Sequence, residues 1–227
     1  IWVAQQSYIA KYNNLTEQIS SVSYPETHKN YRNFREFKAL NVDSYDNVWI
    51  GTYKNGLHIY NEASRKFKHF MPEDNNEQSL SYPEVLVIYR DREDQMWVGT
   101  GKGLNLWDEK VKKFYRFKNS NQDPQGLLGE IIQSVYQTSN GDIWVGTKKG
   151  LNLLNKETNT FEHFTTEQGL ASNLVRAIVE DNNGYLWVTT NKGISKFDIS
   201  QGRFHNFDKY DGLLGVNYYP NSLKRAK

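Results

Sequence analysis

The sequence contains no cysteine, and it has only 5 prolines and 2 methionines among its 227 residues. Without cysteine, the chain can form no disulfide, carry out no thiolate chemistry and build no zinc site of the cysteine type. Long apolar runs are also missing, so no segment is expected to cross a membrane as a helix. The chain begins at Ile1, without Met or a visible secretion signal, which indicates a processed or excised segment.

The sequence also lacks a large excess of charge of either sign. The 28 basic and 26 acidic residues leave a formal net charge of +2, which gives no general attraction to nucleic acid or to a membrane surface. We therefore expect no nucleic-acid partner, and membrane attachment only through flanking segments outside this chain. No pattern indicates a cofactor.

Tryptophan, by contrast, recurs within one short phrase. The phrase reads WVAQ, WIGT, WVGT, WVGT and WVTT, beginning at Trp2, Trp49, Trp97, Trp144 and Trp187. Each of the last four is followed by a glycine, and then by phenylalanines 11 and 14 residues after that glycine: Gly56, Phe67 and Phe70; Gly103, Phe114 and Phe117; Gly150, Phe161 and Phe164; Gly193, Phe204 and Phe207. A period in the forties indicates a repeated supersecondary unit.

The last complete repeat shows what this unit is. Residues 174–181, 185–190, 194–199 and 203–207 have strand-like composition, and turn signals separate them at 182–184, 191–193 and 200–202. Four short antiparallel strands in each period predict an all-β fold, a β-propeller of four-stranded blades. A solenoid of parallel strands is a weaker alternative, because it would need shorter periods and fewer hairpin turns.

In three repeats, tryptophan, the largest side chain, stands two residues before glycine, the smallest. We interpret this pairing as a feature of strand packing. Residues two apart in a strand share a face, so each Trp lies beside the Gly that follows it, and that Gly is expected to permit close backbone approach. These structural positions are Trp2, Trp49, Gly51, Trp97, Gly99, Trp144, Gly146 and Trp187.

The strands expected at the two ends of the sequence predict how the last blade is formed. Residues 211–224 align with 167–180, so the chain would finish on a first strand, whereas it begins on a second strand at Trp2. Joined together, the two ends would form one shared blade, giving five repeats in a single propeller domain over 1–227. The alternative is a run of consecutive blades from a larger propeller.

Residues 139–164 (SNGDIWVGTKKGLNLLNKETNTFEHF) and 182–207 (NNGYLWVTTNKGISKFDISQGRFHNF) carry a family resemblance. They are similar to the two-component regulator propeller repeat, and the linker TTEQGLASNLV at 165–175 resembles its blade junction. This resemblance implies a periplasmic sensor region of a Bacteroidetes hybrid two-component system, which detects carbohydrate fragments and relays to a kinase absent from this chain.

Ligand-binding residues are expected in loops, because the strands are occupied with packing. The turn between the second and third strands and the loop between blades should share one end of the propeller. The candidates there are Tyr53, Lys54, Tyr82, Lys102, Lys149, Lys192, Tyr210, Tyr218 and Tyr31. The lysines could attract an acidic sugar or partner, or could be ordinary solvated turn residues; the tyrosines could stack on a sugar or plug blade junctions.

Acidic turns at the opposite end, such as residues 91–94, could suggest calcium, but they lack a regular ligand ladder and are interpreted as turn formers. The 5 histidines have no metal-ligand spacing; His69 and His163 are interpreted as surface residues of the outer strands. We therefore expect no metal site and no catalytic residue. A structural or homodimerisation propeller, and a propeller hydrolase or lyase, remain alternatives to a sensor that binds an oligosaccharide.

Overall fold

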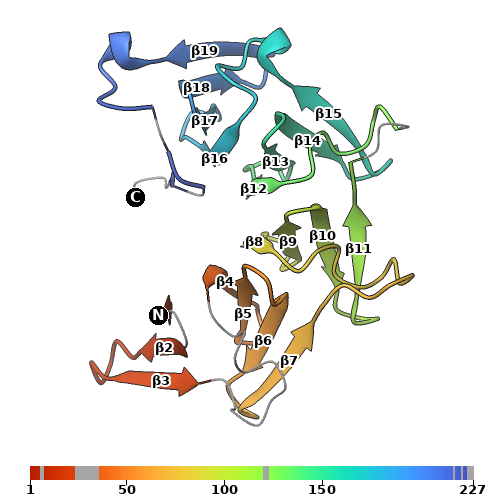
Figure 1. Cartoon of the computed structure of the whole chain (residues 1–227). Helices are drawn as coiled ribbons and strands as arrows, with labels where there is room; N and C mark the ends of the chain where they lie inside the picture. The colour runs from red at the N-terminus through yellow and green to blue at the C-terminus, as the bar shows by residue number, and fades with distance from the viewer. Residues whose placement is uncertain (6–7, 24–35, 120–122, 217, 221, 224–227) are drawn as a thin grey trace. The chain divides into compact units, whose positions relative to one another are not determined.

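The computed structural model describes residues 1–5, 8–23, 36–119, 123–216, 218–220 and 222–223 (Figure 1). Within these residues the chain is built from β-strands with short 3-10 helices, as predicted for an all-β propeller. No helix among them is long and apolar enough to span a membrane. The chain forms two compact units: unit 1 comprises 1–90, 94–101 and 105–116, and unit 2 comprises 91–93, 102–104 and 117–227.

Unit 1 contains three antiparallel sheets, each in sequence order. The first has three strands and the other two have four. Their strands are β1 (Trp2–Gln5), β2 (Tyr8–Tyr12) and β3 (Ile19–Ser23); β4 (Phe37–Val42), β5 (Asn47–Thr52), β6 (Leu57–Asn61) and β7 (Lys66–Phe70); β8 (Val85–Arg90), β9 (Met96–Thr100), β10 (Gly103–Asp108) and β11 (Lys113–Phe117).

Unit 2 contains two four-stranded sheets of the same order. Their strands and helices are β12 (Ile132–Gln137), β13 (Ile143–Thr147), β14 (Leu151–Asn155) and β15 (Thr160–Phe164); η2 (Thr166–Gln168); β16 (Val175–Glu180), β17 (Leu186–Thr190), β18 (Gly193–Asp198) and β19 (Arg203–Phe207); and η3 (Lys209–Asp211). The four strands predicted for the last repeat are therefore confirmed, with each boundary shifted by no more than a residue.

The C-terminal strand expected from residues 211–224 is not formed in the described part of that segment, 211–216, 218–220 and 222–223. The hydrogen bonds of this described part are local: Leu213 N donates to Asp208 O, and Tyr218 Oη donates to Gly215 O. A strand needs a neighbouring strand to pair its backbone groups, and this segment instead satisfies some of them within its own turns.

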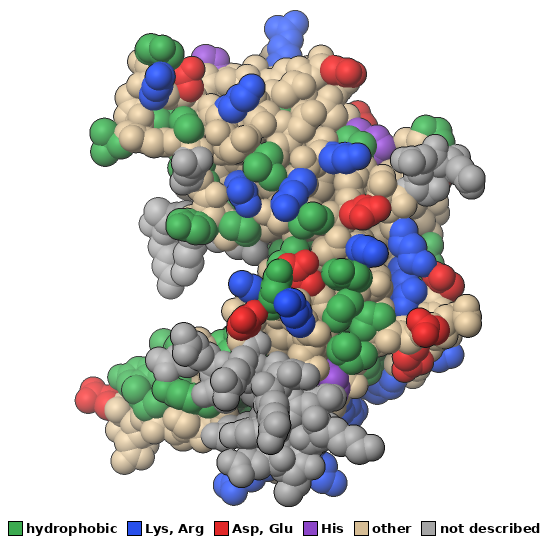
Figure 2. Space-filling view, viewed as in Figure 1, with side chains coloured by type: hydrophobic (Ala, Val, Ile, Leu, Met, Phe, Trp, Pro, Cys, Tyr) green, Lys and Arg blue, Asp and Glu red, His purple; other side chains and the backbone are tan. Residues whose placement is uncertain are grey.

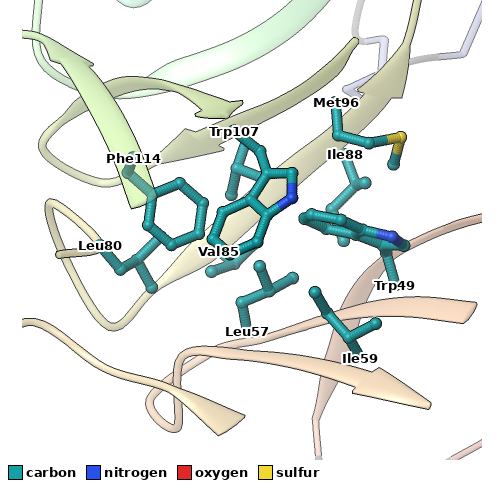
Figure 3. Packing of buried hydrophobic residues seen from close by; sticks show 10 residues of the cluster. Trp49, Leu57, Ile59, Leu80, Val85, Ile88, Met96, Trp107 and Phe114 are labelled. Atoms are coloured by element: carbon teal, nitrogen blue, oxygen red, sulfur yellow. The ribbon is translucent and has the colours of Figure 1, made fainter. Parts of the chain in front are cut away.

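The core lies between neighbouring sheets, where Trp49, Trp97 and Trp144 are buried, whereas Trp2 and Trp187 are half-buried. In unit 1, Trp49 is 1% exposed and meets Trp107 edge-on, with ring centroids 5.8 Å apart (Figure 3). A Cβ atom on Gly51 would lie 2.5 Å from Cγ1 of Val85, the first residue of the next sheet. In unit 2, a Cβ on Gly146 would lie equally close to Cγ1 of Val175. Gly51 and Gly146 thus each admit the first strand of the following blade.

A carboxylate anchors two of the indoles. Trp49 Nε1 donates to Asp43 Oδ2 at 2.8 Å, and Trp187 Nε1 donates to Asp181 Oδ2 at 2.7 Å. Burial acts to raise the pKa of Asp181, but the hydrogen bond from Trp187, with backbone N–H donors, holds that pKa below its usual value. In the β12–β15 sheet the same position is Thr138, and the buried Nε1 of Trp144 has no partner among the described residues.

Replacing Thr138 with Asp should supply the acceptor that Trp144 lacks. We expect Thr138→Asp to raise the free energy of unfolding by about 1 kcal/mol, because it satisfies a buried N–H with a charged acceptor. Urea denaturation measures this gain. In a Trp144→Phe background the gain should vanish, since phenylalanine has no N–H; an equal gain there would show that the indole is not involved.

Candidate functional site

The turns between second and third strands and the loops between blades meet at one end of each blade. In unit 1, Gly56 N donates to Pro83 O at 2.9 Å and Gly101 N donates to Glu84 O at 3.0 Å. In unit 2, Gly103 N donates to Glu130 O at 2.7 Å. We call this the loop end; its described turns are 53–56, 101–102, 148–150 and 191–192, and its described linking loops are 71–84, 118–119 with 123–131, and 165–174.

The turns of the loop end have a common local cause. The threonine that ends the second strand closes the turn: Thr52 Oγ1 donates to Gly56 O at 2.9 Å, and Thr190 Oγ1 donates to Gly193 O at 3.1 Å. Both glycines have positive φ, 68° and 128°. A Cβ on Gly193 would lie 2.1 Å from Phe207 O, so the turn requires glycine and the outer strand packs directly on it.

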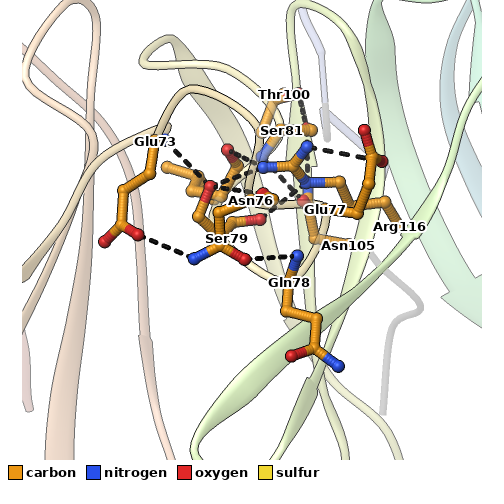
Figure 4. Close-up of polar contacts among 10 residues, drawn as sticks. Glu73, Asn76, Glu77, Gln78, Ser79, Ser81, Thr100, Asn105 and Arg116 are labelled. Atoms are coloured by element: carbon orange, nitrogen blue, oxygen red, sulfur yellow. Dashed lines mark hydrogen bonds and ion pairs between the residues drawn. The ribbon is translucent and has the colours of Figure 1, made fainter.

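The linking loop of unit 1 is held from two strands of the next sheet (Figure 4). Asn105, a fully buried residue of β10, accepts a hydrogen bond from Ser81 N at 2.9 Å. Arg116 of β11 donates to Ser79 O at 2.6 Å and to Leu80 O at 2.9 Å. The loop therefore has a defined backbone path, which gives a rigid support to the side chains it carries.

Unit 2 repeats this arrangement with the equivalent asparagine but with histidine in place of arginine. Asn152 Oδ1 accepts from Leu128 N at 2.9 Å, and Nε2 of His163 lies 2.8 Å from Gly126 O. The half-buried His163 is therefore more than a surface residue of the outer strand, because it fastens the loop. The sequence showed its repeat position, but the partner is a backbone carbonyl 37 residues away, and no motif identifies such a partner.

In unit 1 the candidate Tyr53 lies close to two lysines, and Tyr82 lies beside the turn of the next sheet. Tyr53 is 37% exposed, and the Nζ atoms of Lys38 and Lys54 each lie 5.2 Å from its ring centroid. Lys38 was missed by sequence reasoning; it lies at the register shift between Phe37 and Ala39. Tyr82 is half-buried at the next turn, where a Cβ on Gly101 would lie 3.0 Å from its ring.

In unit 2 the candidate lysines lie in the turns, as expected. Lys102, Lys149 and Lys192 are all exposed. The backbone N–H groups of Lys149 and Lys192 donate to the turn threonines at 3.0 and 3.1 Å, which orients these two residues. Sequence reasoning missed Gln133 and Arg176, which lie at register shifts in β12 and β16 and are joined by a 2.9 Å hydrogen bond.

The remaining candidates are more isolated. Tyr210 is 86% exposed on η3, with Lys209 Nζ 5.1 Å from its ring centroid. Tyr218 is half-buried, and its hydroxyl bonds within its own segment to Gly215 O. Tyr31 lies outside the described residues. In the visible part of each unit, basic side chains are interspersed with acidic ones, so neither presents a field of one sign there (Figure 2).

Within the described ranges, the titratable side chains do not gather into a metal centre. No group of three or more His, Cys, Asp or Glu residues that could hold a metal ion occurs in the described part of the chain. The described histidines are instead engaged with backbone and rings; for example, the rings of His58 and His69 stack with centroids 4.3 Å apart. The chemistry that the loop end offers is thus recognition by tyrosine rings, amides and ammonium groups.

Three of the repeats match a known family model, and the fold is similar to that of solved structures. Residues 79–102, 126–149 and 169–192 match the model of the two-component regulator propeller family. The fold is similar to the extracellular domain of a hybrid two-component system of B. thetaiotaomicron, with 24% identity and a TM-score of 0.74, over 90% of this chain and 28% of that one. No curated protein matches the sequence.

A second similar fold is an enzyme. Virginiamycin B lyase from Staphylococcus aureus has 14% identity and a TM-score of 0.65, over 91% of this chain and 65% of that one. At these identities the likenesses show the β-propeller fold alone. This chain spans 28% of the length of the B. thetaiotaomicron domain that it resembles.

Proposed function

Because three of its repeats are two-component regulator propeller repeats, we propose that the chain is a ligand-sensing part of a hybrid two-component system. In this proposal it is non-catalytic, lies in the periplasm, binds carbohydrate fragments, and relays their presence to a kinase outside this chain. The family match is the observation that carries the proposal. Each matched segment runs from a linking loop through the tryptophan strand to the next turn, and so includes the elements of the loop end.

The loop end supplies chemistry suited to an oligosaccharide. Tyrosine presents an apolar ring together with a hydroxyl, which suits the mixed surface of a sugar. Tyr53 lies between Lys38 and Lys54, whose ammonium groups can donate to sugar hydroxyls or carboxylates. The supporting backbone is held by hydrogen bonds before any ligand arrives, which lowers the entropy cost of binding.

Calorimetric titration of the chain with a panel of neutral and acidic oligosaccharides tests this proposal. We expect heat of binding with at least one of them, and unchanged sugar recovered by chromatography. Absence of heat with every sugar, together with self-association in sedimentation, would favour the structural or dimerisation alternative. A shortened or eliminated sugar product would favour the hydrolase or lyase alternative, for which the lyase-like fold is the supporting observation.

Replacing Lys102, Lys149 and Lys192 together with threonine should weaken binding of an acidic member of the panel. We expect a loss of about tenfold or more in affinity, because charge-assisted hydrogen bonds are removed from oriented turns. The matched control replaces Lys110, Lys156 and Arg203 with threonine, which removes the same charge away from the loop end. Equal weakening in both variants would indicate a nonspecific charge effect.

A further inference from the structure

A groove of about 530 Å³ lies between the β4–β7 and β8–β11 sheets of unit 1, at the end opposite to the loop end. Its lining includes Asp43 after β4, Asn47 at the start of β5, Asn61 at the end of β6, and Glu109 after β10. This volume falls within the roughly 300–1,000 Å³ of small-molecule sites. None of the loop-end candidates lines the groove.

The floor of the groove is aromatic. Trp107 packs edge-on against Trp49, with ring centroids 5.8 Å apart (Figure 3). It also packs edge-on against Phe70, with ring centroids 5.1 Å apart. Trp49 and Trp107 are almost completely buried, whereas Phe70 is half-buried, so the groove exposes ring edges and aliphatic surface rather than a whole indole. Such a floor can contact the apolar face of a ring-shaped ligand.

The two carboxylates of the groove already have partners. Asp43 accepts from Trp49 Nε1 at 2.8 Å and from Asn47 N at 2.9 Å. Glu109 accepts from Trp107 Nε1 at 2.6 Å and forms an ion pair with Lys112. The charge of Glu109 is therefore balanced by Lys112, whereas Asp43 keeps its negative charge and is stabilised by neutral donors.

The rim, by contrast, carries two basic groups. Lys66 and Lys68 are exposed residues of β7, and both line the groove. They alternate with Phe67, so their side chains project from the same face of the strand. Neither ammonium group pairs with a carboxylate in the described ranges of the chain. With Glu109 balanced by Lys112, the two ammonium groups outnumber the single carboxylate of Asp43, so the net charge of the groove is positive.

We propose that this groove is a second binding site, for an acidic oligosaccharide. A sugar carboxylate lies against Lys66 and Lys68, while the apolar ring face contacts Phe70 and the edge of Trp107. The proposal does not depend on ligand binding at the loop end, because the groove shares no lining residue with it.

The β12–β15 sheet provides an internal comparison for the rim. Lys66 pairs with Asn61 and Lys68 with Ile59, and the equivalent pairs in unit 2 are Thr160 with Asn155 and Glu162 with Leu153. The repeat therefore accepts threonine and glutamate at the two rim positions. The basic rim is particular to β7 in this comparison, and the exchange Lys66→Thr with Lys68→Glu should leave the fold intact.

Titration with trigalacturonate, followed by NMR of the indole N–H groups, tests the proposed groove. We expect the Trp49 and Trp107 signals to shift on addition of trigalacturonate, because both N–H groups border the groove, while the Trp144 signal stays in place. Maltotriose, which carries no charge, should not reproduce these shifts. Absence of shifts at Trp49 and Trp107 would overturn the proposal.

The Lys66→Thr/Lys68→Glu variant tests the rim. We expect its affinity for trigalacturonate at this site, taken from the Trp49 and Trp107 shifts, to fall by about tenfold or more. The control variant Lys110→Thr/Lys156→Glu has the same charge change at exposed positions outside both the groove and the loop end, and should bind as the unmodified chain does. Unchanged affinity in the rim variant, or an equal loss in the control, would overturn the proposal.

The loop-end variant separates the two sites. Replacement of Lys102, Lys149 and Lys192 should leave the shifts of Trp49 and Trp107 unchanged, so the groove can be occupied even if the loop end binds nothing. Loss of the shifts in that variant would assign the acidic sugar to the loop end and overturn the separate groove site.

Discussion

Gly51→Ala is expected to lower the free energy of unfolding by about 3 kcal/mol, the upper part of the range for overpacking a core. The added Cβ would lie 2.5 Å from Val85 Cγ1 and 3.0 Å from Val85 O, so both a side chain and the backbone must move. Gly51 has no positive φ that would add backbone strain, so the expected cost is steric. Urea denaturation followed by tryptophan fluorescence measures it.

Two companion variants show whether the interface between blades is the cause. Gly215→Ala should be nearly neutral, because a Cβ there meets nothing within 4 Å. In a Val85→Ala background, Gly51→Ala should cost clearly less than in the unmodified chain, since the nearest methyl group is gone. An additive double variant would mean that Gly51 does not make room for Val85.

Asp43→Ala is expected to lower the free energy of unfolding by about 3 kcal/mol as well. Asp43 is 6% exposed, and its loss removes the acceptor of the buried Trp49 indole and of the Asn47 backbone N–H. Leaving such donors buried without a partner costs their desolvation. Thermal and urea unfolding should agree on the size of the loss.

The control for this prediction is an acidic residue without such contacts. Asp74→Ala changes an exposed residue of the linking loop and should alter stability by less than about 0.5 kcal/mol. In a Trp49→Phe background, the cost of Asp43→Ala should be smaller, because one of its donors is absent. An Asp43→Ala variant as stable as the unmodified chain would show that the carboxylate does not anchor the indole.

Much of the blade structure could be predicted because it depends on short-range periodicity. Alternation places Trp49 and Gly51 on one face, and the glycines mark the turns of the loop end. The strand expected at 211–224 was not predictable in this way, because a strand forms only with a neighbour to pair with. Composition alone cannot show whether that neighbour is present.

Two parts of the candidate site depended on contacts distant in the sequence. Lys38 and Arg176 lie at register shifts, and a shift of pairing changes where a side chain points without leaving a clear signal in a single sequence. His163 fastens a loop through a backbone carbonyl, which any donor of suitable length can do; Arg116 and Asn206 do so elsewhere. The side chains therefore differ between repeats although the contact recurs.

The most direct test of recognition at the loop end is an amide NMR titration with the neutral oligosaccharide that gives the strongest heat. The expected result is a set of shifted signals in turns 53–56, 148–150 and 191–192 and in linking loops 71–84 and 165–174, with the original sugar recovered unchanged. Shifts confined to the turns at the opposite end, or conversion of the sugar to a product, would contradict a non-catalytic sensor that binds through its loop end.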